Sequence, residues 1–294
     1  MKKLILLMLI PVWVTAQKNY SSLLRQFMTG QHDYFHFNGN ILIAKGGNII
    51  YQQDLGYADF NSKRMLNDSS VFELASLSEQ FTAVGIMILK EKKLLSYEDN
   101  VKRFIPDFPY DNVMIRNLLT HTSGLLAFED EFKKKWDRRR VAINRDVIDM
   151  LRQQKDTLLF KPGTKCRYSN TGYVVLAAII EKVSGKSYSD FMTKNIFQPL
   201  GMTHTFVYNA RLAGKTPGNY ALGFVFSDSL KRYIAPDSLH NFDMDYYLGG
   251  IVGDAGVNST TNDLYTWDRA LYSSKLVSKP TLEEMISPLI QIST

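Results

Sequence analysis

The 294-residue chain has a single cysteine, Cys166, so no disulfide can form within it. The fold must therefore be held together by burial of a core. A chain of this length that is 45% hydrophobic can supply such a core, as one large domain or two small ones. We expect Cys166 itself to be a buried packing residue.

The chain also lacks a strong charge of either sign. Its 35 basic and 29 acidic residues give a net charge of +6, which falls to +4 without Lys2 and Lys3. This excess is too small to indicate binding of nucleic acid. A basic run at residues 133–140 is interpreted as a solvated helix face or lid, with contact to an acidic cell-wall polymer as the alternative.

No apolar run is long enough to cross a membrane. The longest, residues 4–14, would rise about 16 Å as a helix, against a hydrocarbon core of about 30 Å. Two lysines precede this run, and small residues up to Ala16 follow it, which is typical of a cleaved signal peptide over residues 1–16. We therefore expect a secreted or periplasmic protein that begins near Gln17 and has no stable membrane anchor.

The order of the predicted elements indicates the fold class. Two β-branched runs, residues 40–44 and 49–57, are joined by a Gly-Gly turn and predict an antiparallel hairpin. Apolar residues at spacings of three and four predict a helix over residues 77–91 with one buried face. Further helices are expected at residues 112–119, 145–154, 171–183, 188–197 and 260–272. Because strands come first and helices dominate the middle, the class is α+β.

Several catalytic patterns are absent from the sequence. There is no Gly-x-Ser-x-Gly, so the strand-turn-helix nucleophile elbow is excluded. There is no His-Glu-x-x-His either. His32 and His36 have the i, i+4 spacing of metal ligands, but no third ligand is evident nearby, so we expect no metal site.

Three segments in order carry the chemistry that remains. Residues 72–83 contain a serine at the start of the predicted central helix, residues 118–125 contain His-Thr-Ser-Gly, and residues 162–173 contain Tyr-Ser-Asn. They resemble the serine beta-lactamase and penicillin-binding protein superfamily, in its class C, esterase and D-alanyl-D-alanine carboxypeptidase branch. The similarity continues to about Pro288.

The resemblance implies a role for each matching residue and a fold. Ser76 would be the nucleophile, Tyr168 would carry the proton to the leaving group, and Asn170 would hold the substrate amide. Taken alone, Tyr168 and Asn170 would be interpreted as a polar loop that caps the following helix, and their position beside Ser76 favours the functional role. The implied fold is an antiparallel sheet packed with helices, plus a mainly helical subdomain at about residues 95–245.

The residues around Ser76 support acyl transfer on physical grounds. A serine hydroxyl is a poor nucleophile until a base takes its proton. Glu79 follows Ser76 by three residues, so both lie on one helix face and the carboxyl can reach the hydroxyl. The helix N-terminus adds a partial positive charge that suits an oxyanion.

Glu79 departs from the pattern of the superfamily, which has lysine at this position. No serine in the chain is followed by lysine at the third residue, so no shift of register restores the motif. A glutamate can act as a base, especially if burial raises its pKa. However, an ionised carboxylate at about 4 Å opposes the developing negative charge by about 4 kcal/mol at moderate dielectric, or on the order of a thousandfold in rate.

The third motif of the superfamily, Lys-Thr-Gly or His-x-Gly on a strand, is not found. Relatives would place it after the segment that matches residues 283–288, and the sequence given ends at Thr294. We therefore expect residues 17–294 to form an incomplete domain that lacks its closing strands. The hairpin would then expose an apolar edge and favour aggregation.

Together these features predict an exported serine hydrolase that forms an acyl-enzyme on D-alanyl peptides, beta-lactams or small esters, without a cofactor. Its catalytic residues would be Ser76, Glu79 and Tyr168, whereas His121 is not expected to be the base. The alternatives are a non-catalytic relative that binds a cell-wall peptide or a partner, and a truncated reading of a longer gene.

Overall fold

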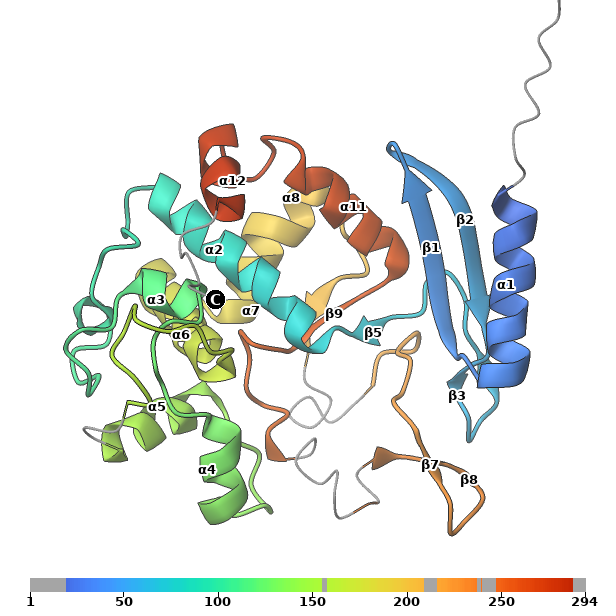
Figure 1. The fold of residues 1–294 in the computed structure, drawn as a ribbon, viewed down its shortest axis with the longest axis horizontal. Helices are drawn as coiled ribbons and strands as arrows, with labels where there is room; N and C mark the ends of the chain where they lie inside the picture. The colour runs from blue at the N-terminus through green and yellow to red at the C-terminus, as the bar shows by residue number, and fades with distance from the viewer. Residues whose placement is uncertain (1–19, 155–157, 209–215, 237–238, 240–246, 288–294) are drawn as a thin grey trace, which may run out of the picture.

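The computed structural model describes residues 20–154, 158–208, 216–236, 239 and 247–287 (Figure 1). The predicted signal peptide, residues 1–16, lies outside the described residues. Export and cleavage near Gln17 therefore stay predictions. No helix in the described ranges combines the length and the hydropathy that a membrane crossing requires.

Each helix expected from the sequence is present with slightly shifted ends, and helices of all kinds dominate the described chain. They are α1 (Tyr20–Phe35), α2 (Glu79–Glu91), α3 (Ile115–Leu119), α4 (Phe128–Lys135), α5 (Asn144–Gln153), α6 (Asn170–Ser184), α7 (Tyr188–Met192), α8 (Gln198–Leu200), α11 (Thr261–Leu271) and α12 (Lys279–Ile286), with two 3-10 turns, η1 (Ala75–Ser78) and η2 (Val101–Arg103), and a π-helical turn, η3 (Thr193–Phe197). Helices α1, α8 and α12 were not expected from the sequence, and α4 was expected only in the interpretation of residues 133–140 as a helix face or lid. Helices α3 to α8 fall within the predicted helical subdomain, whose bounds stay a prediction.

The strands form small antiparallel sheets, which confirms the α+β class. They are β1 (Gly39–Lys45), β2 (Asn48–Leu55), β3 (Tyr57–Asp59), β4 (Arg64–Met65), β5 (Phe72–Glu73), β6 (Phe206–Val207), β7 (Val225–Ser227), β8 (Arg232–Ile234) and β9 (Val257–Ser259). In the described residues they pair as β1-β2, β3-β4, β5-β9-β6 and β7-β8.

The predicted hairpin is confirmed as β1 and β2. Gly46 and Gly47 make its turn at φ +58° and +78°, where a side chain would be strained. The hairpin lies between α1 and α11, and the Tyr265 hydroxyl of α11 donates to the carbonyl of Gly47 at 2.6 Å (Figure 1). Whether the edge of this two-stranded sheet promotes aggregation stays a prediction.

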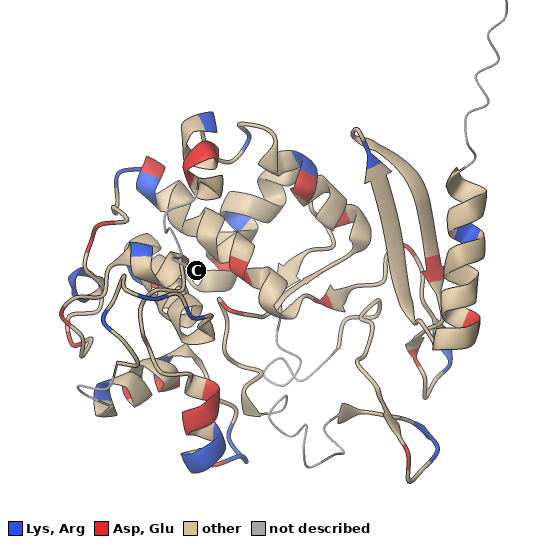
Figure 2. Ribbon diagram, in the orientation of Figure 1, with Lys and Arg blue, Asp and Glu red and all other residues tan. Residues whose placement is uncertain are grey.

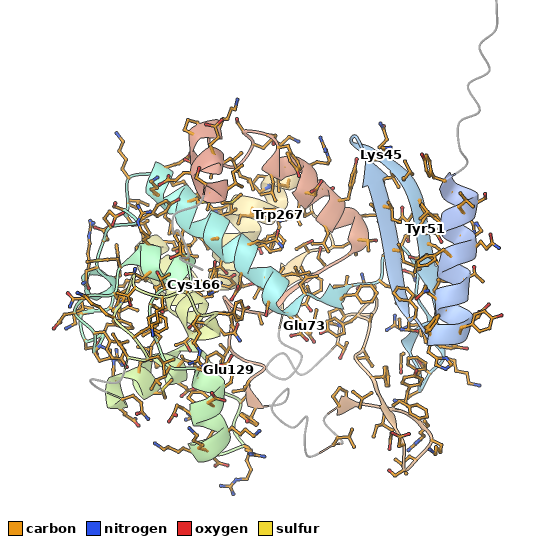
Figure 3. The ribbon with its side chains drawn as sticks, viewed as in Figure 1. Lys45, Tyr51, Glu73, Glu129, Cys166 and Trp267 are labelled. Atoms are coloured by element: carbon orange, nitrogen blue, oxygen red, sulfur yellow. The ribbon has the colours of Figure 1, made fainter. Side chains whose placement is uncertain are left out.

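Helix α2 runs through the middle of the helical part and is buried on more than the one face that its periodicity predicts (Figure 1). It packs against α6 and α7. A Cβ at Gly85 would lie 2.9 Å from the terminal methyl of Met192, so alanine there would require that side chain to shift. On another side, the rings of Phe81 and Trp267 lie 4.2 Å apart between centroids (Figure 3 labels Trp267). This burial fixes the helix that begins next to Ser76.

Strand β9 anchors the start of α2. The amide of Leu74 donates to the carbonyl of Val257 at 2.9 Å, and the amide of Val257 donates to the buried Ser78 hydroxyl at 3.1 Å. The short turn η1 is therefore held on both sides of Ser76.

Charged side chains are spread over the surface with both signs mixed (Figure 2). The basic run begins in α4, whose last turn carries Lys133, Lys134 and Lys135, all exposed, while its first turn is acidic. This arrangement complements the helix dipole. It agrees with the interpretation of that part of the run as a solvated helix face.

The prediction that Cys166 is buried is wrong. Its side chain is exposed, in the loop before α6, and its thiol lies 3.7 Å from the carbonyl of Thr120. The prediction relied on the average behaviour of free cysteine, whereas the position of this loop on the surface decides its exposure.

A buried hydrogen-bond network ties α2 to α7 and to the loop before β9. The Thr82 hydroxyl lies 2.6 Å from the Tyr188 hydroxyl and donates to the carbonyl of Gly253 at 2.6 Å. All of these groups are away from solvent, so each needs its partner. The residue after Gly253 is an aspartate that lines the cleft described below.

We predict that Thr82→Val lowers the free energy of unfolding by about 1–3 kcal/mol, because it leaves a buried hydroxyl and a buried carbonyl without this partner. Thr82→Ser keeps the hydroxyl and is the matched control. Urea unfolding of the three proteins measures the effect. Equal stability of Thr82→Val and the wild type would contradict the network.

Candidate active site

Ser76 lies in the 3-10 turn η1, directly before α2, and its side chain is exposed. The residue before it, Ala75, has φ +46°, a conformation that is uncommon for a residue with a side chain. Such backbone strain persists only where the surroundings impose it, as the bonds to β9 do here. The structure thus places Ser76 directly before a buried helix, as the sequence predicted.

Glu79 is the first residue of α2 and is only 8% exposed. Burial raises the pKa of Glu79 to about 7, and its hydrogen bond with the Tyr168 hydroxyl acts in the opposite direction. The carboxyl group therefore changes between its neutral and ionised forms near neutral pH. A general base is most effective when its pKa lies near the working pH.

Tyr168 brings the nucleophile and the carboxyl together. Its hydroxyl lies close enough to Ser76 and to Glu79 for hydrogen bonding to each to influence its pKa. Burial raises the pKa of Tyr168 above its usual value, the bond to Ser76 lowers it, and the charge of Glu79 raises it again. The phenol thus stays protonated at neutral pH, placed between the two groups that would exchange a proton.

His121 is a site residue whose contact the sequence did not reveal. Its ring lies between Tyr168 and Tyr173, with centroid distances of 4.7 and 5.2 Å. Its Nδ1 accepts the amide of Ser169 at 3.2 Å, so the neutral ring carries its proton on Nε2, which lies 3.6 Å from the Glu79 carboxylate. Burial lowers the pKa of His121, which favours this neutral form.

This geometry makes His121 a neighbour that orients Glu79. That His121 is not the base stays a prediction. The His-Thr-Ser-Gly segment was a signal that this loop belongs to the site. Its spacing in the sequence could not show which residue it would meet.

Asn170 is the first residue of α6, two positions after Tyr168. Its side-chain amide donates to Oε1 of Glu129, so the nitrogen predicted to hold a substrate already has a partner. Its Oδ1 is buried and has no hydrogen-bond partner among the described residues. The substrate-binding role of Asn170 stays a prediction, with the oxygen as the atom left to contact a ligand.

Two acidic residues at the site were missed from the sequence. Asp254 is 7% exposed, and burial raises its pKa to about 7, with the charges of Glu129 and Glu79 adding to the effect. Glu129, in the first turn of α4, bonds Asn170. Neither residue lies in the three segments that carry the resemblance to the superfamily.

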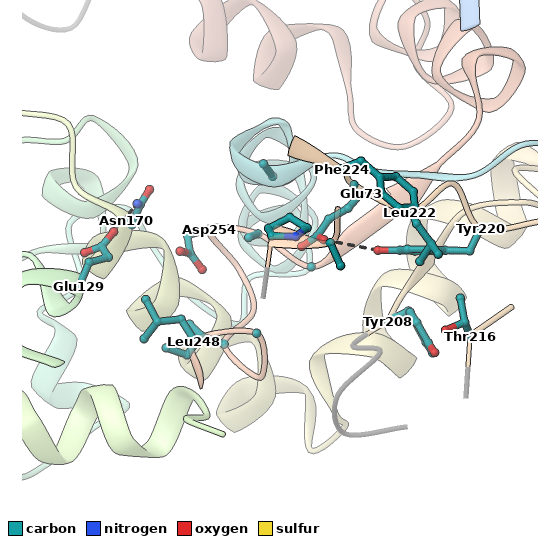
Figure 4. Close-up of a pocket in the computed structure, with 18 of the residues that line it drawn as sticks. Glu73, Glu129, Asn170, Tyr208, Thr216, Tyr220, Leu222, Phe224, Leu248 and Asp254 are labelled. Atoms are coloured by element: carbon teal, nitrogen blue, oxygen red, sulfur yellow. Dashed lines mark hydrogen bonds between the residues drawn. The ribbon is translucent and has the colours of Figure 1, made fainter. Parts of the chain in front are cut away.

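A cleft of about 580 Å³ opens beside the helix start (Figure 4). Ala75, adjacent to Ser76, lines the cleft. One wall is formed by Asn170, Glu129 and Asp254. Another wall contains Glu73 and Tyr220, and the Tyr220 hydroxyl donates a 3.4 Å hydrogen bond to the Glu73 carboxylate. This volume suits a small molecule or a short peptide end.

The described residues contain no group of three side chains placed to share a metal ion. Nδ1 of His32 lies 2.7 Å from the carbonyl of Phe37, and His32 is not among the residues that line the cleft. The groups beside the cleft are instead the hydroxyl of Ser76, the phenol of Tyr168 and the carboxyl of Glu79, which suit proton transfer and acyl transfer.

Comparison with known proteins places this geometry in a family. The family model described as Beta-lactamase matches residues 23–291. The chain is 48% identical over 253 residues to Penicillin-binding protein 4* of Bacillus subtilis (strain 168), covering 86% of this chain and 56% of that protein. It is 30% identical to the putative penicillin-binding protein PbpX of the same strain, covering 86% of this chain and 59% of that protein. The chain thus spans less than two thirds of the length of these relatives.

Solved structures agree with the family match. A penicillin-binding protein from Bacillus halodurans superposes with a TM-score of 0.78 at 25% identity, covering 91% of this chain and 79% of that one. D-amino acid amidase from Ochrobactrum anthropi SV3, complexed with L-phenylalanine amide, gives a TM-score of 0.70 at 25% identity, and the match covers 90% of this chain and 74% of that one. These matches confirm the predicted α+β, beta-lactamase-like fold. The chain therefore belongs to the beta-lactamase family, as part of the beta-lactamase and transpeptidase-like superfamily.

Proposed function

We propose that this chain is a serine hydrolase that forms an acyl-enzyme on Ser76. The observation that carries the proposal is the Tyr168 hydroxyl, which lies close enough to both Ser76 and the buried Glu79 for hydrogen bonding to each to influence its pKa. Nucleophile, proton carrier and base are thus connected in one short path. The path ends beside a cleft of suitable size.

The proton path gives a balanced reaction. The Ser76 oxygen attacks the acyl carbon while its proton passes to the Tyr168 oxygen, and the Tyr168 proton passes to ionised Glu79. The oxyanion forms near the N-terminus of α2, where backbone amides favour negative charge. When the bond to the leaving group breaks, Glu79 returns its proton through Tyr168 to that group, and water then hydrolyses the acyl-enzyme by the same steps.

Glu79 makes this site different from the lysine pattern of the superfamily. A lysine adds positive charge beside the serine oxygen, whereas a carboxylate adds negative charge. A neutral His121 next to Glu79 does not replace the missing cation. The same observation favours the second candidate function, a binding protein that keeps the cleft without turnover.

We propose D-alanyl peptides, beta-lactams and small esters as the substrate classes. The names of the relatives, which are penicillin-binding proteins, support beta-lactams, and the amidase neighbour adds small amides of amino acids. We further propose that the protein is exported to the periplasm or the medium, because residues 1–16 have the sequence pattern of a signal peptide.

The direct test is covalent labelling. We expect a fluorophosphonate and a fluorescent penicillin to form adducts with the purified chain, detected by intact mass, because the exposed Ser76 hydroxyl has a base within reach. The adduct should be absent in Ser76→Ala and present in Ser274→Ala, which removes an exposed serine outside the cleft. A wild-type chain that remains unlabelled would contradict the hydrolase.

The labelling rate should depend on pH through Glu79. An acid with a pKa of about 7 is neutral below that pH and ionised above it, so the base form, and with it the rate, increases as pH rises through about 7. We expect Glu79→Gln, which keeps the shape without the charge, to lose this rise and to label on the order of a hundredfold more slowly above neutral pH. Stopped-flow or quenched labelling across this pH range measures both effects.

Two controls separate the candidate functions. Asp111→Asn changes an exposed carboxyl that pairs with Lys102 and should keep the wild-type profile. Glu79→Lys supplies the cation of the superfamily pattern. If Glu79→Lys is labelled and the wild type is not, the binding protein is favoured. A wild-type labelling rate that does not change with pH would rule out Glu79 as the base.

A further inference from the structure

The cleft has acidic walls in a chain of net positive charge. Glu73, Glu129 and Asp254 line it, and its described lining residues include no lysine, arginine or histidine (Figure 4). A concave site lined by charge of one sign focuses its field and concentrates ligands of the opposite sign. The cleft is therefore suited to a cation.

Three buried acceptor atoms on one wall have no hydrogen-bond partner in the described part of the chain. They are Oδ1 of Asp254, Oε2 of Glu129 and Oδ1 of Asn170. Asp254 is more than nine-tenths buried. Figure 4 shows Glu129 beside Asn170, with Asp254 on the same side of the cleft. A buried acceptor without a donor is costly, and a buried carboxylate more so, which points to a ligand that brings donors and positive charge.

A primary ammonium group matches these acceptors. It is a compact charge with three donors, and here three acceptors come from three separate side chains. A guanidinium presents its donors in a planar fork, which suits a single carboxylate held side-on. A metal ion is also a poorer match than an ammonium group, because no three acidic, histidine or cysteine side chains in the described ranges are placed to share one.

The acceptors lie close to the acyl-transfer groups. Ala75, next to Ser76, lines the same cleft, and Asn170 follows Tyr168 by two residues. The charge of Asp254 raises the pKa of Tyr168, and the charge of Glu79 raises the pKa of Asp254. A ligand with its ammonium on this wall would therefore hold its acyl carbon a short distance away, near Ser76.

We propose that Asp254, Glu129 and Asn170 bind the free primary ammonium group of the substrate, so that the substrate class is an amide or ester of an amino acid with an unblocked amine. The acyl-transfer part of this proposal rests on the function proposed above, whereas the ammonium site does not. The positive charge of the substrate would also reduce the repulsion that Glu79 exerts on the developing serine anion.

Binding to Ser76→Ala tests the ammonium site without any chemistry. Isothermal titration with alaninamide and with N-acetylalaninamide, in each enantiomer and at neutral pH and low salt, compares a protonated amine with a blocked one. We expect at least one enantiomer of alaninamide to bind on the order of tenfold or more tightly than its acetylated form. Added salt should weaken this preference.

Isosteric variants in the Ser76→Ala background locate the site. Asp254→Asn and Glu129→Gln should each reduce the affinity for alaninamide about tenfold or more and leave that for N-acetylalaninamide unchanged. Asp111→Asn, outside the cleft, should keep the preference, and melting curves show that each variant is folded.

Three results would overturn the proposal: no binding of alaninamide at millimolar concentration, equal binding of the two compounds, or a preference that survives in both cleft variants. Because Ser76→Ala cannot be acylated, these results are independent of covalent labelling. If the wild type is labelled but alaninamide does not bind, the hydrolase proposal stands and only the ammonium site is contradicted. If alaninamide binds but the wild type is not labelled, only the hydrolase proposal is contradicted.

Discussion

Desolvation of one carboxyl group is the constraint on which the site depends. Glu79 begins α2, whose apolar side chains pack against α6, α7 and Trp267. That packing leaves the carboxyl mostly out of water and raises its pKa to about 7. A glutamate at the same position on an exposed helix would be ionised throughout the neutral range and would be a weak base. Core packing thus sets the chemistry available to Ser76.

The same packing connects the two functional walls of the cleft. Thr82, one turn after Glu79 in α2, bonds the carbonyl of Gly253, and the next residue is Asp254. The charge of Glu79 in turn raises the pKa of Asp254, together with burial and the charge of Glu129. Ionisation of Glu79 therefore affects the acidic wall of the cleft.

The sequence predicted those parts of the structure that depend on local pattern. Turn chemistry located the β1-β2 hairpin, and helical spacing located α2 and placed Glu79 beside Ser76. It could not predict contacts between distant segments, such as that of His121 with Glu79 or of Asn170 with Glu129, because these depend on how the helices pack. Asp254 acquires its significance only through burial, which its neighbours in the sequence do not reveal.

The most direct measurement is a carbon-13 NMR titration of the side-chain carboxyl groups, with the Glu79 signal assigned by its loss in Glu79→Gln. The account predicts that Glu79 titrates with a midpoint near pH 7, well separated from the exposed glutamates. A midpoint of about 4.3, the ordinary value for glutamate, would contradict it, because the carboxyl would then be solvated and not buried beneath the serine.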